Sequence, residues 1–231
     1  MANSSITTYL GDRKRERLES GLADTMGVRA YNTVMCAVLL YGFIANALVV
    51  YFFAEPLAAL LSGARWWMLL LGYLVPTFAG IFITSTSKNP LVSFLGYNLV
   101  VLPIGVMLAL LLPMVPAGMV VKAMSLTGMV TLTMMVLANL APQFFLGMWR
   151  MLFVGLLVGL VAEIVASFLL GYRGGLFDWL FVLIFSGYIG YDLAKSQVYP
   201  KTPGNAISCA LDLYLDVINI FIRILSILSR R

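Results

Sequence analysis

Acidic and basic residues near the C-terminal end of the chain interrupt a stretch that is otherwise apolar enough to cross a membrane. Asp212, Asp216, Asn219 and Arg223 follow one another within residues 209–230 at helical spacing. On an α-helix this spacing places the four side chains along one stripe. Charged groups are costly inside a bilayer, so they face a bundle interior or a water-filled path. The pattern therefore predicts a functional polar face on a membrane helix, with a purely structural network as the alternative.

The preceding apolar run ends in another acid, Asp192, before a polar linker at residues 195–205. We expect the two runs to form an antiparallel hairpin in which Asp192, Asp212 and Asp216 converge. Helical depth alone pairs Asp192 with Asp212 at least as well as with Asp216. Clustered carboxylates away from water cannot all ionise cheaply, and a pair can share one proton. The cluster is a candidate pH-sensitive switch, and its oxygens would also suit Ca²⁺.

Other charged residues in the apolar runs need partners as well. Glu163 lies in the middle of one run, and a pair with Arg223 would neutralise both. Lys195, one turn after Asp192, is expected to pair with it or to extend to the membrane surface. Arg173 and Asp178 flank the start of residues 176–193 and are expected at the membrane interface.

The composition indicates a multi-pass membrane protein. Of the 231 residues, 61% are hydrophobic and only 11% are charged, which no soluble domain could bury. The absence of histidine excludes histidine-based metal sites, Ser-His catalysis and histidine pH switching. Cys36 and Cys209 lie in apolar runs, where a packing role is expected rather than a disulfide. The net charge of +5 is not read as a nucleic-acid signal, because basic residues cluster before the first apolar run.

Apolar runs separated by polar or proline-containing turns predict an all-α fold with seven transmembrane helices. Pro56 is expected to close the first run, whereas Pro76 and Pro103 lie inside the second and third and could kink them. Recurring glycines, among them Gly80 and Gly96, favour close helix contacts in lipid. The runs span residues 32–53, 66–84, 91–112, 118–140, 148–170, 176–193 and 209–230.

The loop charges predict how the protein sits in the cell membrane. Residues 1–29 form a polar, positively charged tail before the transmembrane domain of residues 30–231. We expect this tail to be cytoplasmic, either disordered or, from Arg13, a surface helix. With seven spans, nine basic residues fall on the cytoplasmic side and five outside, which favours a cytoplasmic N-terminus and an external C-terminus.

One family has a similar motif. The run Ala210-Leu211-Asp212-Leu213-Tyr214-Leu215-Asp216-Val217-Ile218-Asn219-Ile220-Phe221 resembles the signature of the Bax inhibitor-1, or transmembrane Bax inhibitor motif, family, with the length of a prokaryotic-type member. Tyr191-Asp192 matches that family's other acidic position, 24 residues before Asp216. The similarity is strong over about residues 176–228. Upstream it depends on architecture and length.

The resemblance implies seven helices with the seventh central in a compact bundle, and a Ca²⁺-leak channel gated by a pH-sensing pair, here Asp192 and Asp216. Asp212, Asn219, Glu163 and Arg223 are then candidates for an ion pathway or network. Ca²⁺ would be a permeant or bound ion, tentatively held by the three aspartates, with no tightly bound cofactor. The expected partners are the lipid bilayer, Ca²⁺ and protons, with no nucleic acid.

The chain departs from the family in its second run. Bacterial members carry a basic latch residue there, where this sequence offers only Lys88; Lys195 is another candidate. The family's acidic residue on the same helix is absent. A proton-coupled ion carrier and a regulatory membrane protein acting through partners stay open as alternatives. An intramembrane aspartyl protease is the enzyme alternative, but no Gly-x-Gly precedes Asp212 or Asp216. We therefore expect no enzymatic activity.

Overall fold

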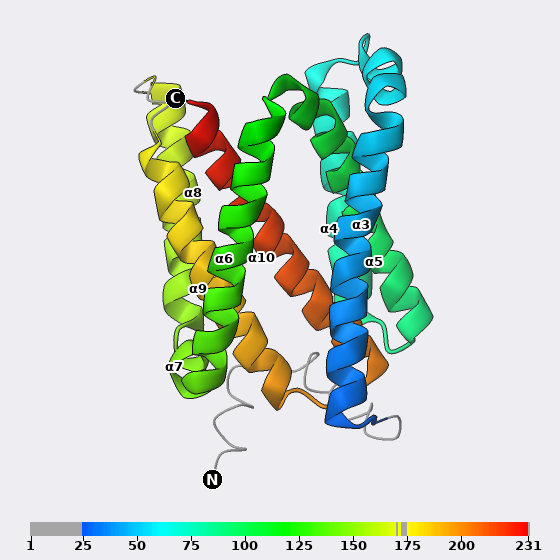
Figure 1. Ribbon diagram of the computed structural model, residues 1–231, viewed down its shortest axis with the longest axis vertical. Coiled ribbons are helices and arrows are strands. Elements are labelled where there is room, and N and C mark those ends of the chain that lie inside the picture. The colour runs from blue at the N-terminus through cyan, green and yellow to red at the C-terminus, as the bar shows by residue number, and fades with distance from the viewer. Residues whose placement is uncertain (1–24, 170, 172–174, 231) are drawn as a thin grey trace. The chain divides into compact units, whose positions relative to one another are not determined.

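The computed structural model describes residues 25–169, 171 and 175–230, and this part of the chain is helical with no strand (Figure 1). The predicted all-α fold is confirmed. Most of the predicted N-terminal tail, together with Arg173 and Arg231, lies outside the described residues. The helices are α3 (Val28–Leu61), α4 (Trp66–Thr86), α5 (Pro90–Leu111), the short 3₁₀ helix η2 (Leu112–Met114), α6 (Ala117–Leu140), α7 (Pro142–Gly147), α8 (Trp149–Leu169), α9 (Leu176–Val198) and α10 (Pro203–Ser229).

Each of the seven predicted apolar runs is a long helix. Among the described residues, six helices are long and apolar enough to cross a membrane: α3, α4, α5 with η2, α6, α8 and α9. The seventh run is α10, a helix of 27 residues that is not among these six. It carries Asp212, Asp216 and Arg223. These helices make the protein a multi-pass membrane protein.

Three helix boundaries differ from the sequence-based predictions. Pro56 does not end the first helix, because α3 continues through it to Leu61. A proline removes one hydrogen bond, and membrane helices tolerate this loss. The turn after α6 contains the short helix α7, which begins at Pro142. The predicted linker of residues 195–205 shrinks to the four residues between α9 and α10.

The start of α10 has a local explanation. Pro203 occupies the first helical position, where a missing N–H is harmless and the fixed backbone angle suits a helix. The backbone N–H of Asn205 donates to Thr202 Oγ1 at 3.2 Å, which caps the first turn. The Asn205 side chain donates to the Pro200 carbonyl at 2.9 Å. These contacts begin the helix six residues before the predicted run.

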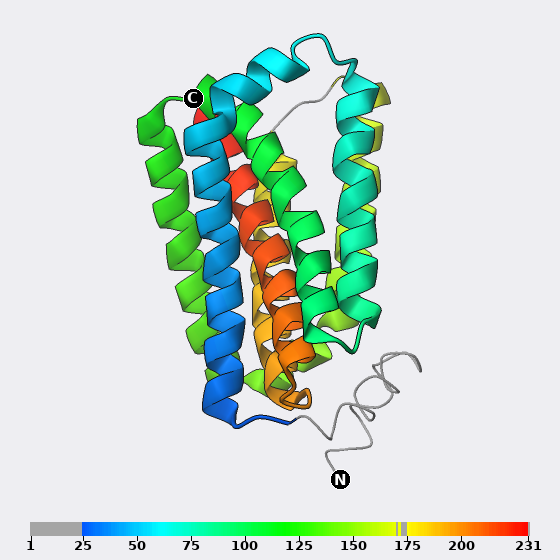
Figure 2. The same cartoon turned by 90° about the vertical axis from the view of Figure 1, so that its right-hand side faces the viewer.

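The chain divides into two compact units, and α10 contributes to both of them. The first contains the described residues up to Met114 together with Tyr199–Leu211. In it α5 packs against α3 and α4 (Figure 2). A Cβ atom added to Gly80 would lie 2.5 Å from the carbonyl oxygen of Gly96. These two glycines therefore allow α4 and α5 to approach closely, as the sequence predicted.

The first unit also holds the short connection before α10. The Tyr31 hydroxyl donates to the buried Cys209 sulfur at 3.3 Å, and neither Cys209 nor Cys36 forms a disulfide bond. The ammonium of Lys201 lies 4.8 Å from the centroid of the Tyr31 ring. Burial lowers the pKa of this ammonium below its ordinary value, because burial disfavours the charged form.

The second unit contains Val115–Val198 and Asp212–Arg231. In it α9 packs against α6, α7 and α8. Gly187 faces Leu152 of α8, and Gly190 faces Phe145 of α7, so closely that neither position has room for a side chain. The tight packing fixes the rotation of α9, so that its polar residues face the same part of the unit as those of α10.

Candidate functional site

Four side chains from α9 and α10 form a cluster, called here the aspartate cluster: Asp192, Lys195, Asp212 and Asp216. The Lys195 ammonium donates to Oδ1 of Asp192 and, at 2.7 Å, to Oδ2 of Asp212. Asp192 and Lys195 are one helical turn apart on α9, and Asp212 is on α10. The ion pairs therefore join the two helices in the antiparallel arrangement that the sequence predicted.

The carboxyls of Asp192 and Asp216 lie close enough to interact electrostatically. Both residues are buried, with relative exposures of 5% and 6%. Oδ2 of Asp216 is buried and has no hydrogen-bond partner among the residues that the structure describes. Two buried carboxylates that lie close together repel each other. A proton shared between them relieves this repulsion.

The aspartate cluster holds three carboxyls and one ammonium. If all three ionise, its formal charge is −2, which is not balanced by the groups that form it. Among the described residues no group of three acidic or sulfur-bearing side chains is placed to hold a metal ion. The Lys195 ammonium contacts Asp192 and Asp212, two of the three aspartates of the tentative Ca²⁺ site, and that site stays a prediction. Bound protons or an incoming cation would reduce the negative charge of the aspartate cluster.

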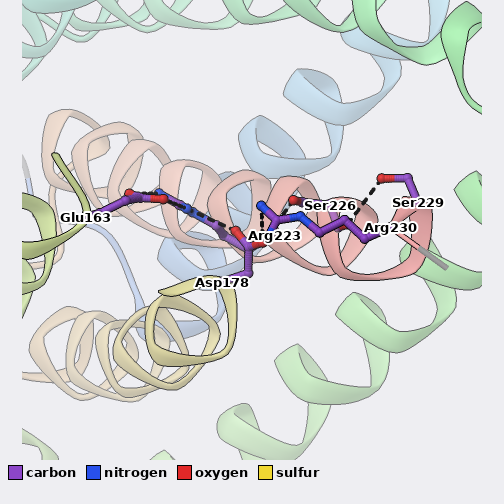
Figure 3. A network of polar contacts seen from close by, with 6 residues as sticks. All are labelled: Glu163, Asp178, Arg223, Ser226, Ser229 and Arg230. Atoms are coloured by element: carbon purple, nitrogen blue, oxygen red, sulfur yellow. Dashed lines mark hydrogen bonds and ion pairs between the residues drawn. The ribbon is translucent and has the colours of Figure 1, made fainter. Parts of the chain in front are cut away.

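A second group of side chains, called here the arginine network, joins α8, α9 and α10 near the other end of α9 (Figure 3). Arg223 donates to Glu163 Oε1 at 2.6 Å and Oε2 at 2.9 Å, and to Asp178 Oδ1 at 3.0 Å. Ser226 donates to Asp178 Oδ2 at 2.9 Å, and Arg230 pairs with the same oxygen at 3.1 Å. The predicted pair of Glu163 and Arg223 is present.

Asp178 has partners that the sequence analysis did not predict, whereas its expected position at the membrane interface stays a prediction. Its relative exposure is only 2%; it accepts from Arg223 and Ser226 of α10 and pairs with Arg230, the residue after that helix. Arg223, Ser226 and Arg230 are spaced by three and four residues, so they share one face of α10. That spacing was visible in the sequence and could have indicated an acidic partner near the start of α9.

The other predicted site residues lie outside these two groups. The Asn219 side chain donates to the Leu215 carbonyl in its own helix at 2.8 Å. Lys88 is exposed in the turn between α4 and α5. Of the two candidate latch residues, the one that contacts Asp192 is Lys195, from the same helix.

Comparisons with known proteins agree with this architecture. A family model described as "Inhibitor of apoptosis-promoting Bax1" matches residues 24–231. An uncharacterized membrane protein of Vibrio cholerae is 32% identical over 117 residues, and the match covers 49% of this chain and 52% of the relative. The chain thus spans about half the length of this curated relative. No solved structure gave a significant match. The family match covers almost the whole chain, and on this basis the protein belongs to the Bax inhibitor-1 family of membrane proteins.

Proposed function

We propose that the protein is a pH-sensitive Ca²⁺-leak channel of the cell membrane, gated by Asp192 and Asp216. The observation that supports this proposal is that two buried carboxyls, one on α9 and one on α10, lie close enough to interact electrostatically. Titration of this pair changes the force between α9 and α10, because an ionised pair repels and a pair with one proton attracts. A further proton on Asp192 weakens its ion pair with Lys195, which also changes the contact.

The excess of carboxyls over ammonium groups in the aspartate cluster favours a cation as the transported ion. Asp212 is more exposed than its two neighbours, with 32% of its side-chain surface accessible. We therefore assign to Asp212 the attraction of cations and to Asp192 and Asp216 the response to protons. Carboxylate oxygens are ligands that Ca²⁺ prefers, so Ca²⁺ is the ion to test first.

Ca²⁺ flux into liposomes that contain only this protein tests the channel. We expect flux above that of empty vesicles, and we expect it to change between about pH 5 and pH 8. The Asp192→Asn/Asp216→Asn double variant keeps the side-chain sizes but removes the titrating pair, so its flux should not respond to pH. Absence of flux at every pH would contradict the channel. Uptake that requires a proton gradient would indicate a proton-coupled carrier instead.

The orientation in the membrane is part of the proposal. Seven spans and the charge bias of the loops support a cytoplasmic N-terminus and an external C-terminus. Reporter fusions at the two ends should therefore report opposite sides of the membrane. Reporters on the same side would mean that one long helix, with α10 as the first to examine, does not span.

A further inference from the structure

We propose that Lys195 is a tethered cation that occupies a divalent-cation site in the aspartate cluster, and that an incoming divalent cation must displace it. This inference deepens the proposed function, because it names the residue that regulates admission of the ion. On this proposal, Lys195 is a residue that determines which cations enter the site.

The first support is the position of the ammonium. Its nitrogen contacts Oδ1 of Asp192 and lies 2.7 Å from Oδ2 of Asp212. A Ca²⁺ ion binds carboxylate oxygens at about 2.3–2.6 Å, so it needs nearly the same place between the same oxygens. The Lys195 side chain is buried, with 8% of its surface accessible. The ammonium and a divalent cation therefore compete for one location.

The second support is an oxygen that the ammonium does not satisfy. Within the described part of the chain, Oδ2 of Asp216 is buried without a hydrogen-bond partner, although the Asp216 carboxyl lies close enough to Asp192 to interact with it electrostatically. A buried carboxylate oxygen without a partner is costly, and ammonium donors do not reach it here. A divalent ion has twice the charge of the ammonium and binds six to eight oxygens, so it could use this oxygen as well.

The third support is a place for the displaced ammonium. The Lys195 nitrogen lies 5.3 Å from the centroid of the Tyr191 ring, at a distance that permits a cation–π contact. Lys195 is in the last turn of α9, where its flexible stem can carry the ammonium toward the helix end. The lysine can therefore leave the carboxylates without losing every favourable interaction.

Ca²⁺ binding to the purified full-length protein in detergent tests this role without depending on transport. Tb³⁺ serves as the probe, because Tyr191 can sensitise its luminescence at short range, and Ca²⁺ affinity follows from competition. We expect Lys195→Gln to bind Ca²⁺ at least about tenfold more tightly than the wild type. Lys195→Arg, which keeps the positive charge, should resemble the wild type. Lys122→Gln removes an exposed lysine of α6 and should leave the affinity unchanged.

A double variant separates displacement from net charge. Asp192→Asn/Lys195→Gln removes one negative and one positive charge, so the cluster keeps the net charge of the wild type and loses the tethered cation. We expect this variant to bind Ca²⁺ more tightly than the wild type, and it is the deciding protein if Lys195→Gln alone does not fold. Equal affinity of the double variant and the wild type would overturn the inference.

The binding result and the flux result can fail separately. If the double variant binds Ca²⁺ more tightly than the wild type, but the wild type moves no Ca²⁺ into liposomes, the proposed channel is wrong and the proposed role of Lys195 is supported. If the wild type moves Ca²⁺ but the double variant does not bind Ca²⁺ more tightly than the wild type, the proposed channel is supported and the proposed role of Lys195 is wrong.

Discussion

The two polar groups on α9 and α10 differ in how well their charges are matched. In the arginine network two guanidinium groups face two carboxylates, and Asp178 is satisfied by Arg223, Ser226 and Arg230. In the aspartate cluster one ammonium faces three carboxyls, and one oxygen of Asp216 has no hydrogen-bond partner in the described part of the chain. The two groups are about 14 residues apart on α9, which is roughly 21 Å along the helix.

The difference in charge balance suggests different roles for the two groups. A balanced network gains nothing from binding a proton or a metal ion, so the arginine network is suited to hold three helices together. An unbalanced cluster can reduce its charge only by taking up protons or cations, so it is suited to respond to them. Buried charges alone therefore do not identify a functional site, because the charge balance around them decides what they do.

The largest expected effect comes from a matched pair of substitutions in the two groups. Asp178→Asn removes a charge that two arginines need, and should lower the free energy of unfolding by about 3 kcal/mol. Asp216→Asn removes a charge that the aspartate cluster does not balance, and should change the free energy of unfolding by less than about 1 kcal/mol. Thermal unfolding in detergent measures both: the midpoint of Asp178→Asn should fall by roughly 6–12 °C. Equal losses in the two variants would contradict the comparison.

The same comparison can be made on transport. Asp192→Asn and Asp216→Asn should each shift or abolish the pH dependence of Ca²⁺ flux, because each removes one member of the titrating pair. Asp212→Asn should mainly reduce the flux and leave the pH dependence in place. Glu163→Gln in the arginine network is the control and should leave the pH dependence unchanged. If Asp212→Asn removes the pH response while Asp216→Asn keeps it, the assignment of the pair is wrong.

The smallest expected effect concerns two serines on α10. Ser226→Ala removes a hydrogen bond to the buried Asp178 and should destabilise the protein by about 1 kcal/mol. Ser229→Ala, three residues on, removes only an exposed bond to a backbone carbonyl and should have almost no effect. Unfolding of both variants under one condition measures the difference. A larger loss for Ser229→Ala would show that Asp178 does not depend on Ser226.

Much of the fold could be predicted from the sequence, because helix formation in these apolar runs depends mainly on local pattern. All seven runs are helices, and the antiparallel relation of α9 and α10 follows from their short connection. The exceptions are also instructive. Pro56 was expected to stop α3, but its effect depends on whether the surroundings tolerate a missing hydrogen bond, which local pattern does not reveal.

For the candidate site, the sequence by itself determined which residues need partners, since the cost of a charge in a membrane helix is a property of that residue and its apolar neighbours. Only the tertiary structure decided which partners they have. Lys195 could equally have extended to the membrane surface, but in the fold it lies between Asp192 and Asp212. Asp178 is buried in the protein because Arg223, Ser226 and Arg230, at the end of α10 and just after it, reach its carboxylate. Such pairings depend on the rotation and register of whole helices. These are fixed by packing against residues distant in sequence, as Gly187 packs against Leu152 and Gly190 against Phe145.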